Sequence, residues 1–91
     1  MMVDLKQLRK RIDEVDEQIL QALSERAKIC KAIGAAKNEQ KIPIKDADRE
    51  NEVYNRVKKR AAELAIDPDQ VEAVYREIVN MCSAVQKVKE K

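Results

Sequence analysis

The side chains best suited to chemistry lie where a helical pattern calls for apolar residues. Apolar residues recur every three or four positions from Leu5 to Ala36, and this row brings Arg26 to a core-type position. Lys37 follows eleven residues later, close to three helical turns, so the two cations point the same way about 16 Å apart. Because buried cations are costly unless they are paired, two on one face indicate an anionic ligand.

A third long polar side chain, Gln86, lies one turn beyond Cys82 on the apolar row of a later helix. Each of these residues taken alone has a structural explanation. Arg26 and Lys37 can extend to solvent or pair with a glutamate of a neighbouring helix, and Gln86 can be an ordinary residue at a helix end. Their joint occurrence favours an anion-binding site.

The residue types that are missing narrow the chemistry of such a site. The chain of 91 residues has no histidine and one glycine, which excludes a histidine base, imidazole metal sites and a glycine-rich phosphate loop. Nineteen Lys and Arg nearly balance seventeen Asp and Glu, and the only aromatic residues are two tyrosines, so nucleic-acid binding is not indicated. The longest uncharged run, residues 78–86, is too short to span a membrane.

The two cysteines give an expectation about the compartment. Cys30 and Cys82 stand far apart in the sequence and form no CxxC motif. We therefore expect both to be reduced, in a cytoplasmic protein.

Helices are predicted to position these residues. Turn residues and two prolines divide the chain into a helix over about 4–37, a loop over 38–46, a helix over about 47–64 and a helix over about 68–88. Asp4, Asp46 and Asp67 are the predicted N-caps. Because no useful strand-like alternation occurs, the predicted fold class is all-α, as a single domain over residues 1–91.

The first predicted helix is too long for a compact monomer. It would measure about 50 Å, whereas a compact globule of this size is only about 32 Å across. A second copy is the simplest cover, so we predict a homodimer. If two copies of this helix pack antiparallel about a two-fold axis near residue 21, Arg9 of one copy lies level with residue 33 of the other. It would then lie between Arg26 and Lys37, and two equivalent shared sites would form.

Over about Leu5 to Gln86 the sequence resembles the all-helical class of chorismate mutases, the three-helix intertwined homodimers. The resemblance rests on LRKRIDEVDEQILQALSER (8–26), AAK (35–37), IPIKDADRE (42–50) and the stretch from Cys82 to Gln86. It implies the rearrangement of chorismate to prephenate, in phenylalanine and tyrosine biosynthesis. This is an isomerase reaction that uses no cofactor, metal or covalent intermediate.

The resemblance also implies roles for the long polar side chains. Arg26 and Arg9 of the partner subunit would hold the two carboxylates of chorismate. Lys37 and Gln86 would contact the ether oxygen, where negative charge builds as the C–O bond breaks. Catalysis would need no proton transfer. The site would hold the flexible enolpyruvyl arm of the substrate over the ring, and fixed charge would stabilise the ether oxygen.

Four further residues follow from the same resemblance. Glu50, with the backbone around Asp46, would hold the ring hydroxyl, and Arg49 would line the site. Cys82 stands where the family commonly has a small hydroxyl or amide residue, so its expected contact with a carboxylate stays open.

Two other functions remain open from the sequence. Isochorismate-pyruvate lyases share the fold and a similar site, although the loop and Glu50 region fits the mutase better. A helical dimerisation module without activity would need neither Arg26 nor Lys37.

Overall fold

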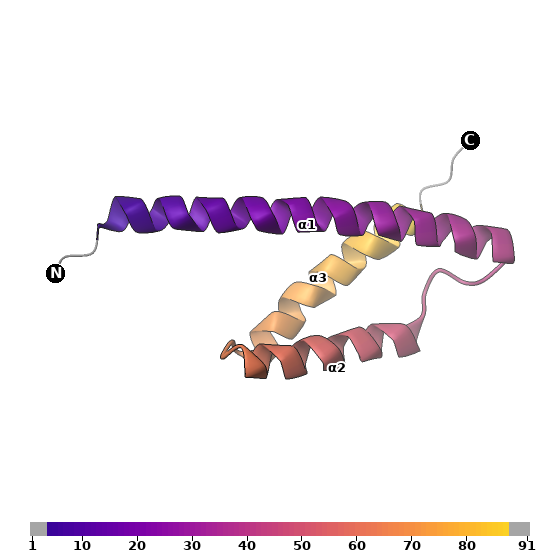
Figure 1. Cartoon of the computed structure of the whole chain (residues 1–91). Helices are drawn as coiled ribbons and strands as arrows, with labels where there is room; N and C mark the ends of the chain where they lie inside the picture. Colours follow the sequence, from indigo (N-terminus) through magenta and orange to yellow (C-terminus); the bar gives the residue numbers. More distant parts are fainter. Residues whose placement is uncertain (1–3, 88–91) are drawn as a thin grey trace.

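Three α-helices make up most of the chain in the computed structural model, which describes residues 4–87 (Figure 1). They are α1 (Leu5–Gln40), α2 (Ala47–Glu63) and α3 (Pro68–Gln86). The all-α prediction is confirmed, since residues 4–87 contain no strand. Residue 88, the last residue predicted for the third helix, lies outside the described residues.

The helix ends follow from local side chains. Side-chain oxygens of Asp4, Asp46 and Asp67 accept hydrogen bonds from backbone amides of the first turns, as predicted. The end of α1 differs from the prediction, because the helix continues three residues past Lys37. It stops at Lys41, whose backbone is left-handed (φ 58°) and whose amide donates to the carbonyl oxygen of Asn38 at 3.2 Å.

α3 holds the other two helices together. α1 and α2 each pack against α3 and, within residues 4–87, not against each other. In Figure 1, α3 runs obliquely from the end of α2 to the C-terminal half of α1. Few of residues 4–87 are buried: Cys30 and Gly34 of α1, Val53, Tyr54, Val57 and Ala61 of α2, and Val79 of α3.

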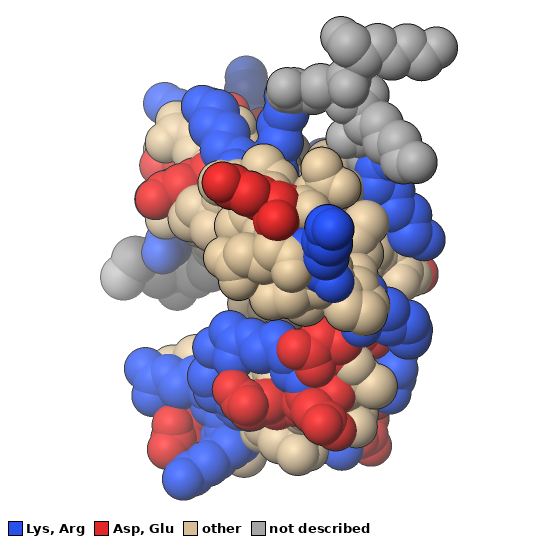
Figure 2. Space-filling model, turned by 90° about the vertical axis from the view of Figure 1, so that its right-hand side faces the viewer, with Lys and Arg blue, Asp and Glu red and all other residues tan. Residues whose placement is uncertain are grey.

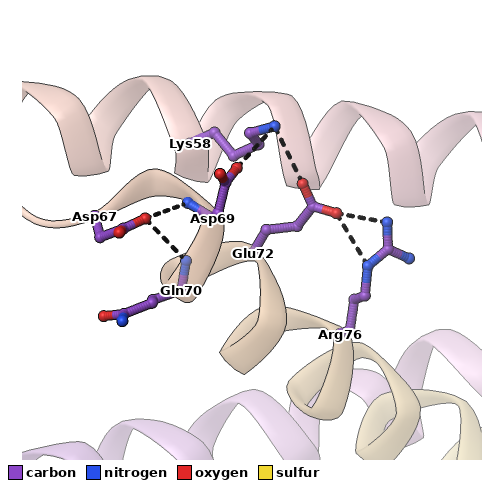
Figure 3. A network of polar contacts seen from close by, with 6 residues as sticks. All are labelled: Lys58, Asp67, Asp69, Gln70, Glu72 and Arg76. Atoms are coloured by element: carbon purple, nitrogen blue, oxygen red, sulfur yellow. Dashed lines mark hydrogen bonds and ion pairs between the residues drawn. The ribbon is translucent and has the colours of Figure 1, made fainter.

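A polar network fixes α2 against the first half of α3 (Figure 3). The Nζ atom of Lys58 lies 3.2 Å from a carboxylate oxygen of Glu72 and 3.7 Å from one of Asp69. The other Glu72 oxygen accepts two hydrogen bonds from Arg76, at 2.6 and 3.0 Å. These hydrogen bonds, from Arg76 first and then from Lys58, hold the pKa of the Glu72 carboxyl below its usual value. The guanidinium of Arg76 also stacks over the Tyr54 ring, 4.5 Å from its centroid.

The single chain is elongated. It measures 61 × 30 × 14 Å with a radius of gyration of 16.9 Å, whereas a compact domain of this length would have about 12 Å. The N-terminal half of α1 extends beyond α2 and α3, as Figure 1 shows. Figure 2, seen from the end where α1 stops and α2 begins, shows basic and acidic side chains interspersed over the surface.

Candidate functional site

A pocket of about 440 Å³ lies where the C-terminal half of α1, the start of α2 and the end of α3 meet. This volume is in the range of small-molecule sites. Seven of the eight predicted site residues line it: Arg26, Lys37, Asp46, Arg49, Glu50, Cys82 and Gln86. The packing on α3 therefore brings together segments that are far apart in the sequence.

Arg9 is the predicted site residue that the single chain does not bring to this pocket. It is exposed on the N-terminal half of α1 and is not among the lining residues. The helical rise places it about 25 Å from Arg26 along the same axis. A role for Arg9 in the site therefore requires a second copy of the chain.

Positive charge dominates the pocket lining. Four basic side chains, Arg26, Lys37, Arg49 and Arg56, stand against two acidic ones, Asp46 and Glu50. Sequence analysis missed Arg56, although its spacing was informative: Arg49, Val53 and Arg56 follow at steps of four and three and so share one face of α2. Ser83, which points about 100° away from Cys82 on a helix and was therefore not predicted as a site residue, also lines the pocket.

Arg26 and Lys37 are half-buried in this lining without a carboxylate partner. Arg49 pairs with Glu52 at 2.7 Å, and Lys45 approaches Glu50 at 3.8 Å. In the part of the chain that the structure describes, no carboxylate lies within ion-pair distance of Arg26 or Lys37. The structural explanation, pairing with a glutamate of a neighbouring helix, is therefore not what this chain adopts.

The ammonium of Lys37 ties the loop after α1 to the pocket. Its Nζ atom donates to the carbonyl oxygen of Ile44 at 2.7 Å, and the backbone amide of Ile42 donates to the carbonyl oxygen of Lys37 at 2.8 Å. An ammonium has three donors, so this contact with Ile44 leaves others for an anionic ligand. The loop in turn carries Ile44 and Asp46 into the lining.

Gly34 allows α3 to approach α1 closely beside the pocket. A Cβ atom on Gly34 would lie 2.7 Å from the Cα atom of Gln86, closer than real Cβ atoms pack against backbone. The single glycine of the chain therefore determines how near Gln86 comes to α1. The amide nitrogen of Gln86 donates to the sulfur of Cys82 at 3.1 Å, while its Oε1 atom is buried without a hydrogen-bond partner.

The prediction of two reduced cysteines is wrong. Cys30 of α1 and Cys82 of α3 form a disulfide in the pocket wall, with a Cα–Cα distance of 5.3 Å. The 52 residues between them do not reveal this contact, because it arises where α1 and α3 pack together. Cys82 consequently has no S–H group to donate to a ligand.

Two kinds of feature are not found among residues 4–87. The described side chains contain no group of three or more Cys, Asp or Glu residues arranged to hold a metal ion. Among the same residues, no helix combines the length and the apolar character needed to cross a membrane.

The family described as chorismate mutase type II has a model that matches residues 8–87. The matched segment covers most of the chain and includes every residue that lines the pocket. The chain belongs to the chorismate mutase type II family. The resemblance predicted from its motifs is thus confirmed over nearly the full length.

Similar proteins support the assignment. The chain is 33% identical over 87 residues to a protein of Methanocaldococcus jannaschii named chorismate mutase, covering 96% of this chain and 88% of that one. It is 37% identical over 89 residues to a bifunctional chorismate mutase/prephenate dehydratase of Aquifex aeolicus, covering 94% of this chain but a quarter (25%) of that protein. Among solved structures, a conserved hypothetical protein from Pyrococcus furiosus matches with a TM-score of 0.73 and 36% identity, covering 96% and 100% of the two chains.

Proposed function

We propose that this chain catalyses the rearrangement of chorismate to prephenate, the step on the route to phenylalanine and tyrosine. The observation that carries the proposal is a half-buried arginine and lysine, Arg26 and Lys37, without carboxylate partners in a pocket that Gln86 also lines. Membership in the chorismate mutase family and the named relatives support it.

Binding would orient a flexible dianion. Chorismate carries two carboxylates, and a guanidinium binds a carboxylate with two parallel hydrogen bonds. Arg26 would hold one of them, while Arg49 and Arg56 add positive potential. A substrate held with its side chain folded over its ring has already lost the conformational freedom that opposes the reaction.

Charge stabilisation would complete catalysis. The breaking C–O bond leaves negative charge on the ether oxygen before the new C–C bond forms. Lys37 and Gln86 would each donate a hydrogen bond to that oxygen from fixed positions, which is most effective where water is excluded. Glu50, near the N-cap Asp46 of α2, would accept from the ring hydroxyl.

The proposal includes a homodimer with shared sites. Six large apolar residues on the N-terminal half of α1 are exposed: Leu5, Leu8, Ile12, Val15, Ile19 and Leu20. A second pocket of about 440 Å³, away from the site, is lined mostly by apolar residues of α2 and α3 and of the turn between them, including Val57, Leu64, Ile66 and Val74. A second copy would cover such surfaces, and Arg9 of the partner subunit would complete the carboxylate site.

The cytoplasmic location is kept as a prediction, although reduced cysteines no longer support it. Disulfides are rare in cytosolic proteins outside hyperthermophiles. Immunodetection of the chain in fractionated cells tests the location.

A spectrophotometric assay of chorismate consumption tests the activity. Wild-type protein should convert chorismate to prephenate, and Arg26→Ala should lower kcat/KM by about 10²-fold, because a substrate carboxylate loses the group that orients it. Lys28→Ala is the matched control, because Lys28 is an exposed cation on the same helix outside the pocket lining. Absence of turnover by folded wild-type protein, or pyruvate release from isochorismate with chorismate untouched, would overturn the proposal.

Complementation between two inactive variants tests the shared site. Arg9→Ala and Arg26→Ala chains refolded together in equal amounts should recover roughly a quarter of wild-type turnover, since half of the dimers are mixed and one of their two sites is intact. Each variant refolded alone serves as the baseline. A mixture no more active than these baselines would show that Arg9 does not act across an interface.

A further inference from the structure

The Cys30–Cys82 disulfide lies between two polar side chains of the pocket. Arg26 precedes Cys30 by one turn on α1, and Gln86 follows Cys82 by one turn on α3. All four residues line the pocket. The cross-link therefore joins the two helices between the groups to which the proposed function assigns carboxylate binding and charge stabilisation.

Both sulfur atoms accept hydrogen bonds from these side chains. The Nε2 atom of Gln86 donates to the Sγ atom of Cys82 at 3.1 Å. The Nη1 atom of Arg26 lies 3.7 Å from the Sγ atom of Cys30, a weaker contact. The Gln86 contact constrains a side chain whose other polar atom, Oε1, is buried without any partner.

The chemical state of Cys82 decides which end of the Gln86 amide can face it. A disulfide sulfur carries no hydrogen and can only accept, so it favours the amide orientation that presents Nε2. A thiol also donates. Reduction would give Cys82 an S–H group able to satisfy the buried Oε1 atom, and the amide would then turn its oxygen towards the sulfur.

We infer that the Cys30–Cys82 disulfide is a positioning pair that orients the Gln86 amide for the reaction and supports Arg26, so that the redox state of the cysteines sets turnover. The inference rests on the proposed function, because it assigns the Gln86 N–H group to the ether oxygen. The cysteines themselves transfer nothing to the substrate. Their effect passes through Gln86, and kcat should therefore change more than KM.

Reduction of the Cys30–Cys82 disulfide by a dithiol reagent tests this inference. One thiolate of the reagent attacks a disulfide sulfur and forms a mixed disulfide, and the second closes the reagent into its own cyclic disulfide. Two electrons and two protons pass to Cys30 and Cys82. Titration should find no thiol per chain before reduction and both cysteines as thiols afterwards.

Kinetics of the two forms give the first result. We expect kcat for chorismate to fall about tenfold or more on reduction, since one misdirected donor forfeits much of its stabilisation of the transition state, while KM changes less than kcat. A Cys30→Ala/Cys82→Ala chain treated with the same reagent controls for effects of the reagent itself. An unchanged kcat with both thiols titrated would overturn the inference.

Two double variants separate positioning from a purely structural cross-link. Cys30→Ala/Cys82→Ser places a hydroxyl donor beside Gln86, as a thiol would, whereas Cys30→Ala/Cys82→Ala leaves no donor there. Both lack the disulfide, and both are assayed well below their unfolding midpoints. We expect the serine variant to have the lower kcat. Equal kcat values in the two variants would reduce the disulfide to a structural cross-link.

A spectroscopic readout keeps the inference separate from the proposed activity. The side-chain amide resonances of Gln86, assigned by their loss in Gln86→Glu, should shift between oxidised and reduced wild-type protein. Unshifted resonances would overturn the orientation argument even if chorismate is consumed. If the resonances shift but neither form consumes chorismate, the disulfide orients the Gln86 amide as inferred, and the proposed activity is refuted.

Discussion

The two halves of α1 have similar sequence patterns and opposite surroundings. In residues 5–22, apolar side chains recur at helical spacing, yet Leu5, Ile12 and Ile19 are each at least half exposed. In residues 23–40, the same helix packs on α3, buries Cys30 and Gly34, and contributes Arg26 and Lys37 to the pocket. A periodic apolar row therefore indicates that a helix face will be covered, but not which part of the chain, or which chain, covers it.

The polar residues of the two halves differ in the same way. Arg9 on the first half is exposed and away from the pocket, whereas Arg26 on the second is half-buried within it. If a second copy covers the first half, both arginines serve the same site. The first half would then pack against the partner subunit, whereas the second half packs against α3 of its own chain.

Charges placed among the exposed apolar residues of the first half of α1 should have the largest effect on dimerisation and activity. Ile12→Lys combined with Ile19→Lys removes two apolar side chains whose burial is worth about 1.5–3 kcal/mol each and adds like charges. We expect the dimer to dissociate and chorismate turnover to fall to background, because Arg9 is no longer delivered. Sedimentation equilibrium and the chorismate assay measure both effects.

The matched control adds the same charge to the opposite face of the same segment. Glu14→Gln combined with Gln21→Lys lies about half a helical turn away from the apolar row and should leave both dimer and activity near wild type. The proposal that a second copy covers these apolar residues would be contradicted if the wild-type chain sediments as a monomer. An intact dimer of the Ile12→Lys/Ile19→Lys chain would contradict it as well.

A change at Gln86, opposite the second half of α1, should have the next largest effect. Gln86→Glu should lower kcat at neutral pH by about 10²-fold or more and regain part of it in acid, because only a protonated carboxyl can donate to the ether oxygen. Activity measured across the pH range gives the profile. Gln86→Ala is the control, since it has no group to protonate there and should not recover; matching profiles for both variants would exclude the proposed donor role.

The close approach at Gly34 should have the smallest effect of the three. In an exposed helix, Gly→Ala usually stabilises by up to about 1 kcal/mol, but here the added Cβ meets the Cα atom of Gln86 at 2.7 Å. We expect Gly34→Ala to destabilise the protein by about 1–3 kcal/mol, typical of overpacking, and to lower kcat by displacing Gln86. Thermal unfolding and the chorismate assay test both effects.

A glycine substitution at the next position serves as the control for Gly34→Ala. Ala35→Gly, at an exposed position of α1, measures the backbone propensity alone. A Gly34→Ala chain that is more stable than wild type would show that α1 and α3 can separate at this point without cost.

Much of the pocket followed from residue type and spacing. Arg26, Lys37 and Gln86 stood out because they interrupt apolar rows, and all three line the pocket. Arg56 also follows Arg49 and Val53 at helical spacing on α2, but it was not recognised because it does not interrupt an apolar row. The disulfide and the role of Gly34 had no local signal, because both depend on where α1 and α3 meet.

The sequence by itself determined three helices, their N-caps at Asp4, Asp46 and Asp67, and the polar residues set among apolar ones, because helix period and capping depend on neighbours a few positions away. The tertiary structure decided which of these residues meet. It paired Cys30 with Cys82, set Gln86 against Gly34 and left Arg9 outside the pocket. These outcomes depend on how whole helices cross and pack, and that geometry is a property of the assembled fold rather than of any one segment.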